Sequence, residues 1–311
     1  MVSRRNVRIK VMKALYAANR DIALNNEAVK NYYKKSIDMA YNAYLFNLHQ
    51  LLKVAEYANT DAAIRAEKLL PSEADKNFST KLFNNPVTLS IAENLDFHSV
   101  LKTRKLRYRV DADFTRRFYQ NFAQKDIYKE YLIEEETSNE RHVDVLLDLY
   151  KGCLKDEVFD EMVDEQFISW MDDKSLVVGA MKKTLKSLPS SGKFYQDHEP
   201  SDETCMDYGL ELLHKTLFFD KDLEAIIQPV LKNWDMERVA IIDMILLKLA
   251  LCELMHFSSI PPKVTINEYV ELAKLYSTPK SKDFVNGVVD RLTKQLTKDG
   301  RIKKEGRGLV S

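Results

Sequence analysis

Glycine, proline and cysteine are scarce in this sequence, which has 8 Gly, 8 Pro and 3 Cys in 311 residues. With 45% hydrophobic and 30% charged residues, the composition is typical of a soluble helical globular protein and argues against a disordered chain. The three cysteines lie about fifty residues apart and show no paired spacing. A disulfide scaffold is therefore not expected, and a reducing cytoplasm fits this cysteine usage.

Long hydrophobic runs are also missing. The most apolar stretch, 239–257, is interrupted by Asp243, Lys248, Glu253 and His256. Because a membrane-spanning helix needs roughly 20 nearly uncharged residues, this stretch is expected to form a core helix instead. No apolar segment follows the basic N-terminus, so neither a signal peptide nor a membrane span is expected.

The common catalytic and cofactor motifs are absent: the sequence contains no GxGxxG, GxxxxGK[ST], GxSxG or HExxH. Only His198, Cys205 and His214 come near one another, and their spacing matches no zinc pattern. The acidic pairs within 134–173 could serve acid–base chemistry or a divalent ion, but their density along helices is typical of solvated faces. No catalytic residue, metal or cofactor is therefore expected.

Positive and negative charges balance over the whole chain but are segregated along it. The first 20 residues carry six Lys or Arg and no acid, and 98–109 carries five Lys or Arg and no acid. In contrast, 126–173 holds 16 acidic residues against four basic ones, a net charge of −12. Since local fields decide what a surface attracts, the zero net charge does not exclude a polyanionic ligand.

Hydrophobic residues recur with a helical period throughout, and no segment shows the alternation of a strand. The sequence therefore predicts an all-α fold. Ser3, Ser138 and Asp156 are candidate N-caps, and Pro71 is expected to close a long second helix over 27–70. After a loop at 189–200, helices are expected over 203–219, 220–233, 236–256, 263–276 and from 281 to before 300. The 236–256 helix is apolar around most of its circumference, which predicts a position at the centre of a helical bundle.

The arginines of the first helix are the best candidates for ligand binding. Arg4, Arg5 and Arg8 occupy its first turns, where the helix dipole disfavours positive charge. A polyanion would turn this cost into attraction, since the guanidinium group suits phosphate and stacks on bases. The alternative is a basic helix start whose side chains are simply solvated.

Several stretches resemble the NusB family. The first helix, from Arg4 to Tyr16, is similar to the arginine-rich first helix of that family. The stretches 219–234 and 237–254 resemble its third and fourth helices, the former including the internal Pro229. The most specific match is PKVTINEYVELAK at 262–274 followed by KDFVNGVVD at 282–290, which is similar to the family signature INExxELAK…FVNGxLD.

The resemblance implies a NusB-like helical bundle formed by 1–20 and 205–298, with a large helical insertion at 21–204 after the first helix. The insertion includes the acidic region 126–173. Residues 299–311 form a basic tail that is expected to be disordered.

The resemblance also implies a function. NusB proteins pair with NusE, a small-subunit ribosomal protein, bind boxA-type single-stranded RNA and join the RNA polymerase elongation complex to suppress premature termination. Arg4, Arg5, Arg8 and Tyr16 match RNA-contacting positions of the first helix. Tyr276 and Phe284 match aromatic positions flanking an RNA-contacting loop, with Ser281 inside that loop. These RNA-binding residues are named by family resemblance, and both aromatics also lie on apolar stripes that would suit core positions.

One position departs from the family pattern, and two other functions compete. Lys280 stands where the loop normally carries an acidic residue, so this loop should attract phosphate. A protein-interaction module without RNA binding is the first alternative. The second, the NusB-like accessory domain of an RNA methyltransferase, would need a nucleophilic cysteine after a proline, which no cysteine here satisfies.

Overall fold

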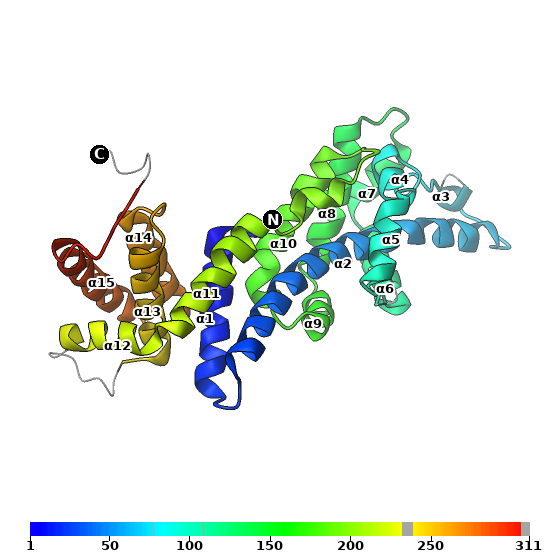
Figure 1. Ribbon diagram of the computed structural model, residues 1–311. Coiled ribbons are helices and arrows are strands. Elements are labelled where there is room, and N and C mark those ends of the chain that lie inside the picture. Colours follow the sequence, from blue (N-terminus) through cyan, green and yellow to red (C-terminus); the bar gives the residue numbers. More distant parts are fainter. Residues whose placement is uncertain (77, 108, 232–238, 306–311) are drawn as a thin grey trace. The chain divides into compact units, whose positions relative to one another are not determined.

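The computed structural model describes residues 1–76, 78–107, 109–231 and 239–305. No β-strand occurs in these residues, and the predicted all-α class is confirmed (Figure 1). The chain divides into two compact units: unit 1 comprises Asp38–Glu199 with Met1, and unit 2 comprises Val2–Ile37 and Pro200–Ser311. The helix α2 (Asn26–Ala66) contributes its first part to unit 2 and the rest to unit 1.

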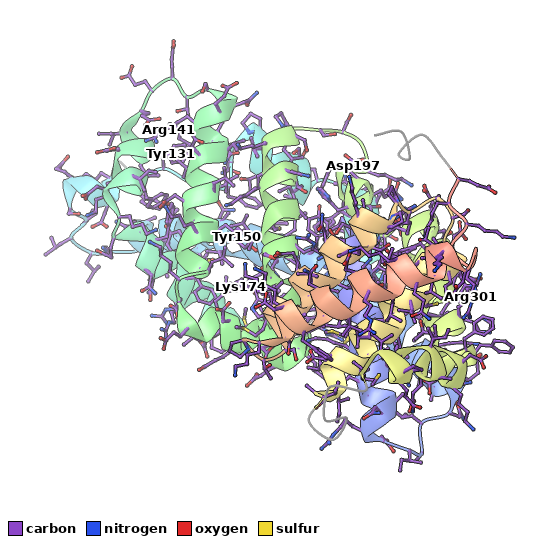
Figure 2. The ribbon with its side chains drawn as sticks, turned by 90° about the vertical axis from the view of Figure 1, so that its left-hand side faces the viewer. Tyr131, Arg141, Tyr150, Lys174, Asp197 and Arg301 are labelled. Carbon is purple, nitrogen blue, oxygen red and sulfur yellow. The ribbon has the colours of Figure 1, made fainter. Side chains whose placement is uncertain are left out.

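Unit 1 is built around the long apolar face of α2. Tyr150 and Tyr131, labelled in Figure 2, are fully enclosed in its core. The Tyr150 hydroxyl donates to Asn47 Oδ1 of α2 at 2.9 Å, and Tyr131 bonds to His142 Nδ1 at 2.8 Å. Besides α2, the elements of unit 1 are α3 (Glu73–Lys76), α4 (Pro86–Ala92), α5 (Leu95–Thr103), α6 (Ala112–Ala123), α7 (Asp126–Ile133), α8 (Asn139–Cys153), α9 (Glu157–Gln166), α10 (Trp170–Ser187) and the 3₁₀ helix η1 (Phe194–His198).

The predicted caps of unit 1 are confirmed. Ser138 caps α8 by accepting a hydrogen bond from the Arg141 backbone N–H, and Asp156 caps α9 by accepting one from Val158. The predicted end of the long second helix is wrong, because α2 stops at Ala66 and the chain bends before Pro71.

Unit 2 is a helical bundle with α13 at its centre, as the sequence predicted. This helix contacts α1, α11, α12, α14 and α15, and most of its side chains are buried. The elements of unit 2, besides the start of α2, are α1 (Arg4–Arg20), the π-helix η2 (Glu203–Leu210), α11 (Glu211–Phe218), α12 (Asp220–Ile227), the 3₁₀ helix η3 (Gln228–Leu231), α13 (Ile241–His256), α14 (Pro262–Tyr276) and α15 (Ser281–Lys298).

Local chemistry explains the departures from the predicted helices of unit 2. The expected helix 220–233 becomes α12 followed by a 3₁₀ turn at Pro229, which has no backbone N–H to continue an α-helix. The expected helix 203–219 begins as a π-helix and becomes α-helical only at Glu211. The first part of the expected helix 236–256 lies outside the described residues.

The boundaries of the units differ from those of the predicted core and insertion. Residues 21–37 and 200–204, placed in the insertion from the sequence, belong to unit 2. Tyr33 explains part of this, because its hydroxyl donates to the Cys205 carbonyl at 2.8 Å. In the described part of the predicted tail, Lys304 Nζ donates to the carbonyl of Glu253, in the last turn of α13, and to that of the C-cap residue Phe257. Residues 306–311 lie outside the described residues.

Candidate nucleic-acid interface

The first turn of α1 presents two arginines from a well-defined helix start. Ser3 is the N-cap: its hydroxyl accepts a hydrogen bond from the Asn6 N–H, and the Asn6 side chain accepts one from the Ser3 N–H. This reciprocal cap satisfies two backbone donors and fixes where the helix begins. The first turn contains no acidic residue, and Arg4 and Arg5 are exposed there.

Arg5 is held in a defined orientation beside a cleft. Its Nε and Nη2 donate to the two carboxylate oxygens of Glu268 at 2.9 and 2.8 Å. This hydrogen bond raises the pKa of Arg5 and lowers the pKa of Glu268. The side chain of Arg5 remains 49% exposed, so the other N–H groups of its guanidinium can meet a ligand. The cleft, of about 400 Å³, is lined by Ser3, Arg4, Arg5, Arg8, Ser259, Ile260, Pro261, Val264 and Glu268.

Arg4 lies at the same end of α1 and is held more loosely. Its guanidinium is 3.8 Å from the exposed carboxylate of Glu203 and 5.2 Å from the ring centroid of Tyr208. An exposed pair at this distance contributes little free energy, so a phosphate group could replace Glu203 at small cost.

Arg8, in contrast, is an internal residue. Its side chain is only 3% exposed, and its Nε and Nη2 donate to the two carboxylate oxygens of Glu253, both at 2.9 Å. Glu253 is fully buried and also accepts hydrogen bonds from the hydroxyls of Tyr208, Thr265 and Tyr269. The sequence placed Arg8 among the RNA-contacting arginines, but in the structure its donors serve this network.

The second half of α1 continues the exposed face past α14. Lys13 Nζ lies 5.8 Å from the ring centroid of Tyr276. The Arg5–Glu268 and Lys13–Tyr276 contacts are separated by eight residues in each helix, so long side chains link α1 to α14 at two levels about 12 Å apart. At 100° per residue, Arg5, Lys13 and Tyr16 fall on one face of α1. Tyr16 is 39% exposed and Tyr276 is half-buried.

The predicted residues at the loop between α14 and α15 differ in their exposure to solvent. Lys280 is exposed at the start of α15, and Phe284 is half-buried in its first turn. Ser281 is only 2% exposed, and its hydroxyl donates to Asp243 Oδ2 at 2.7 Å and accepts from the Thr278 N–H at 3.2 Å. Its side chain therefore closes the loop onto α13.

Part of the predicted set is accessible in unit 2, along α1, at the end of α14 and at the start of α15. We call the exposed or half-exposed side chains of Arg4, Arg5, Lys13, Tyr16, Tyr276 and Lys280 the α1 stripe. Lys13 was missed from the sequence, although it lies on the helical face that Arg5 and Tyr16 define. Glu268, which orients Arg5, stands in the INExxELAK-like segment and was not singled out from the sequence.

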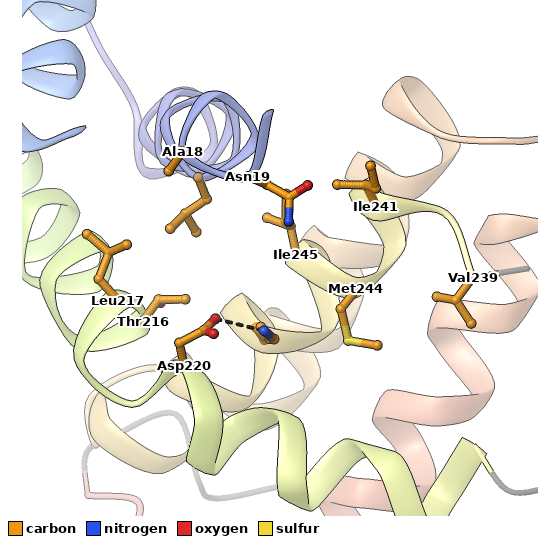
Figure 3. Close-up of a pocket in the computed structure, with 11 residues that line it drawn as sticks. Ala18, Asn19, Thr216, Leu217, Asp220, Val239, Ile241, Met244 and Ile245 are labelled. Carbon is orange, nitrogen blue, oxygen red and sulfur yellow. Dashed lines mark hydrogen bonds and ion pairs between the residues drawn. The ribbon is translucent and has the colours of Figure 1, made fainter. Parts of the chain in front are cut away.

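A second cleft in unit 2 is lined mainly by apolar side chains. It measures about 420 Å³ and is lined by Leu15, Ala18, Asn19, Thr216, Leu217, Asp220, Val239, Ile241, Met244, Ile245 and Lys248 (Figure 3). Lys248 is neutralised by hydrogen bonds to Asp220 at 2.7 Å and Glu224 at 3.0 Å. The cleft is therefore mainly apolar and does not extend the positive charge of the α1 stripe.

No helix in the described part of the chain is long and apolar enough to cross a bilayer.

Known proteins match the part of the chain that includes most of unit 2. The model of the NusB family matches residues 178–294. The transcription antitermination protein NusB of Salinibacter ruber is 42% identical over 114 residues, which is 37% of this chain and 69% of that relative. The NusB proteins of Chloroherpeton thalassium and Oleidesulfovibrio alaskensis are 37% and 38% identical over 35% and 29% of this chain, covering 52% and 58% of those relatives. No solved structure matches the chain.

The family model and the signature-like segments agree on the same helices. The matched range contains α11 to α14 and most of α15, including Glu253 and Glu268, which bind the arginines of α1. The Salinibacter ruber relative is matched over more than two thirds of its own length at 42% identity. The chain belongs to the NusB family.

Proposed function

We propose that this protein is a transcription antitermination factor without catalytic activity. It would act in the cytoplasm by binding boxA-type single-stranded RNA together with NusE and joining the RNA polymerase elongation complex. The named relatives are transcription antitermination proteins. The observation that carries the proposal is the α1 stripe, in which Arg5, Lys13 and Tyr16 share one face of α1 and Lys13 Nζ lies 5.8 Å from the ring centroid of Tyr276.

The α1 stripe has the two properties that single-stranded RNA requires. Arg4, Arg5 and Lys280 supply positive charge for the phosphate backbone. Tyr16 and Tyr276 supply ring faces, and base–aromatic stacking contributes on the order of 1–3 kcal/mol per base. Phe284, half-buried beside the loop, would support Tyr276 or offer a further ring edge.

Within this proposal Arg8 and Ser281 are positioning residues. Arg8 ties α1 to α13 through Glu253, and Ser281 ties the loop to α13 through Asp243. Both contacts fix the elements that carry the exposed side chains.

The test is RNA affinity across a salt series with NusE present, using a boxA-type RNA. Arg5→Gln and Lys280→Asp should each weaken binding, and each should flatten the plot of log affinity against log salt by about 1, because one phosphate contact is lost. Lys294→Gln, which removes an exposed cation paired with Asp290 on the later part of α15, serves as the control and should change neither value.

The two outcomes separate the proposal from its main alternative. If the wild-type protein bound no boxA-type RNA with or without NusE, a protein-interaction module would be the better reading. If Lys280→Asp kept the wild-type affinity and salt slope, the loop would not belong to the RNA site.

A further inference from the structure

A second concentration of positive charge lies in unit 1, at the C-terminal end of α5. Between Phe97 and Val110 the chain carries five Lys or Arg and no acidic residue. Arg104 turns toward α2, where its guanidinium bonds to Asp38 and to Asn42 Oδ1. Lys102, in the last turn of α5, and Lys105 and Arg107, just after it, are exposed; we call these three residues the α5 cations.

The α5 cations are not neutralised within the protein. Among the described residues, none of the three forms an ion pair, whereas Arg117 in the same unit is held by Asp156. The rest of the unit is acidic, with a net charge of −12 over 126–173. The α5 cations therefore form a local positive surface on a unit whose 126–173 segment is strongly negative.

The backbone at Lys105 gives an independent reason to assign these side chains a use. Its φ is +57°, in the left-handed region, and the Leu106 N–H closes the turn by bonding to the Leu101 carbonyl at 2.8 Å. This is the position after a helix that glycine occupies with the least strain. A cation at the end of a helix also opposes the helix dipole, but Lys102 already provides one within the last turn. Lys105 thus carries a charged side chain at a position whose backbone conformation favours glycine.

We propose that the α5 cations form a second phosphate-contacting surface, which binds RNA flanking the boxA-type element. The inference rests on the proposed function, because an RNA recruited through its boxA-type element brings further phosphates to the same chain. Contacts of this kind read charge and not sequence.

The test compares two RNAs on the full chain with NusE present: a short boxA-type RNA, and the same element extended by a uridine tract. The triple variant Lys102→Gln, Lys105→Gln and Arg107→Gln should bind the extended RNA on the order of tenfold more weakly, with the salt slope flattened by about 2. Its affinity for the short RNA should equal that of the wild type. The matched control changes Lys182, Lys183 and Lys186 of α10 to Gln, which removes the same charge from exposed positions of the same unit and should leave both affinities unchanged.

Lys105→Gly separates binding from folding. Glycine relieves the left-handed strain, so the unfolding temperature should stay the same or rise while the affinity for the extended RNA falls. A purely structural role for Lys105 predicts no loss of affinity.

Three results would overturn the inference. The first is wild-type protein that binds the extended RNA no more tightly than the short one. The second is a triple variant that binds the extended RNA as the wild type does. The third is a triple variant that keeps the wild-type affinity for the extended RNA but binds polyglutamate more weakly than the wild type does. This result would indicate that the α5 cations bind an acidic protein. If the wild-type protein bound neither the short nor the extended RNA, this result would instead count against the proposed function itself.

Discussion

Glu253 joins three helices and the π-helix of unit 2 through one carboxylate. Its oxygens accept hydrogen bonds from Arg8 of α1, Tyr208 of η2, and Thr265 and Tyr269 of α14. The side chain is fully buried, so every donor depends on this acceptor and not on water. A buried charge is tolerated only where such partners surround it, which is why Arg8 and Glu253 occur as a pair.

The first prediction concerns this pair. Glu253→Gln removes the fully buried counter-charge of the Arg8 guanidinium and leaves it only the more distant carboxylate of Glu268 at 3.6 Å, so it should destabilise unit 2 by about 3–5 kcal/mol. Urea unfolding followed by circular dichroism measures the change. Removing both charges with Arg8→Met and Glu253→Leu should cost less than the sum of the two single substitutions, because neither partner is then left alone. A single variant as stable as the wild type would show that water reaches the site.

At the scale of elements, Gly209 allows the π-helix η2 to approach α1 and α2 closely. Gly209 lies at this crossing, where a Cβ atom would collide with Val7 Cγ1 of α1 and with Tyr33 Oη of α2. Tyr33 in turn is anchored to the Cys205 carbonyl of the same π-helix. The glycine is therefore required by close packing and not by its backbone conformation.

The second prediction follows from this crossing. Gly209→Ala should destabilise unit 2 by about 1–3 kcal/mol, because the neighbouring side chains must shift to admit the methyl group. Thermal unfolding measures the loss. Gly179→Ala is the matched control, since a Cβ there meets nothing within 4 Å, and it should be neutral or slightly stabilising. Equal effects of the two substitutions would argue against the tight crossing.

The elements also show what the sequence could and could not predict. Helical periodicity and caps such as Ser3 and Asp156 are local, so α1, α9 and the central α13 followed from neighbouring residues alone. The burial of Arg8 and Ser281 depends on Glu253 and Asp243, which lie 245 and 38 residues away along the chain. A basic or polar side chain on a helix looks the same in sequence whether it faces solvent or a buried carboxylate. That distinction appears only once the helices are packed.

At the scale of the whole molecule, the chain combines a NusB-like unit with a second helical unit that has its own core. Trp170 is fully enclosed in the core of unit 1, where its indole N–H donates to Asp160 at 3.0 Å. The α1 stripe, in contrast, is built entirely from residues of unit 2. Each unit therefore has its own set of internal contacts, and the proposed RNA binding by the α1 stripe should not depend on the core of unit 1.

The last prediction tests this independence. Trp170→Ala should destabilise unit 1 by about 3–5 kcal/mol, since it removes a large buried side chain and leaves a cavity. Calorimetry of the full chain should show one unfolding transition moving to lower temperature while the other stays in place. Affinity for a short boxA-type RNA, measured below both transitions, should be unchanged. If both transitions moved together, α2 would couple the two units into one cooperative structure, because it is the helix that contributes residues to both.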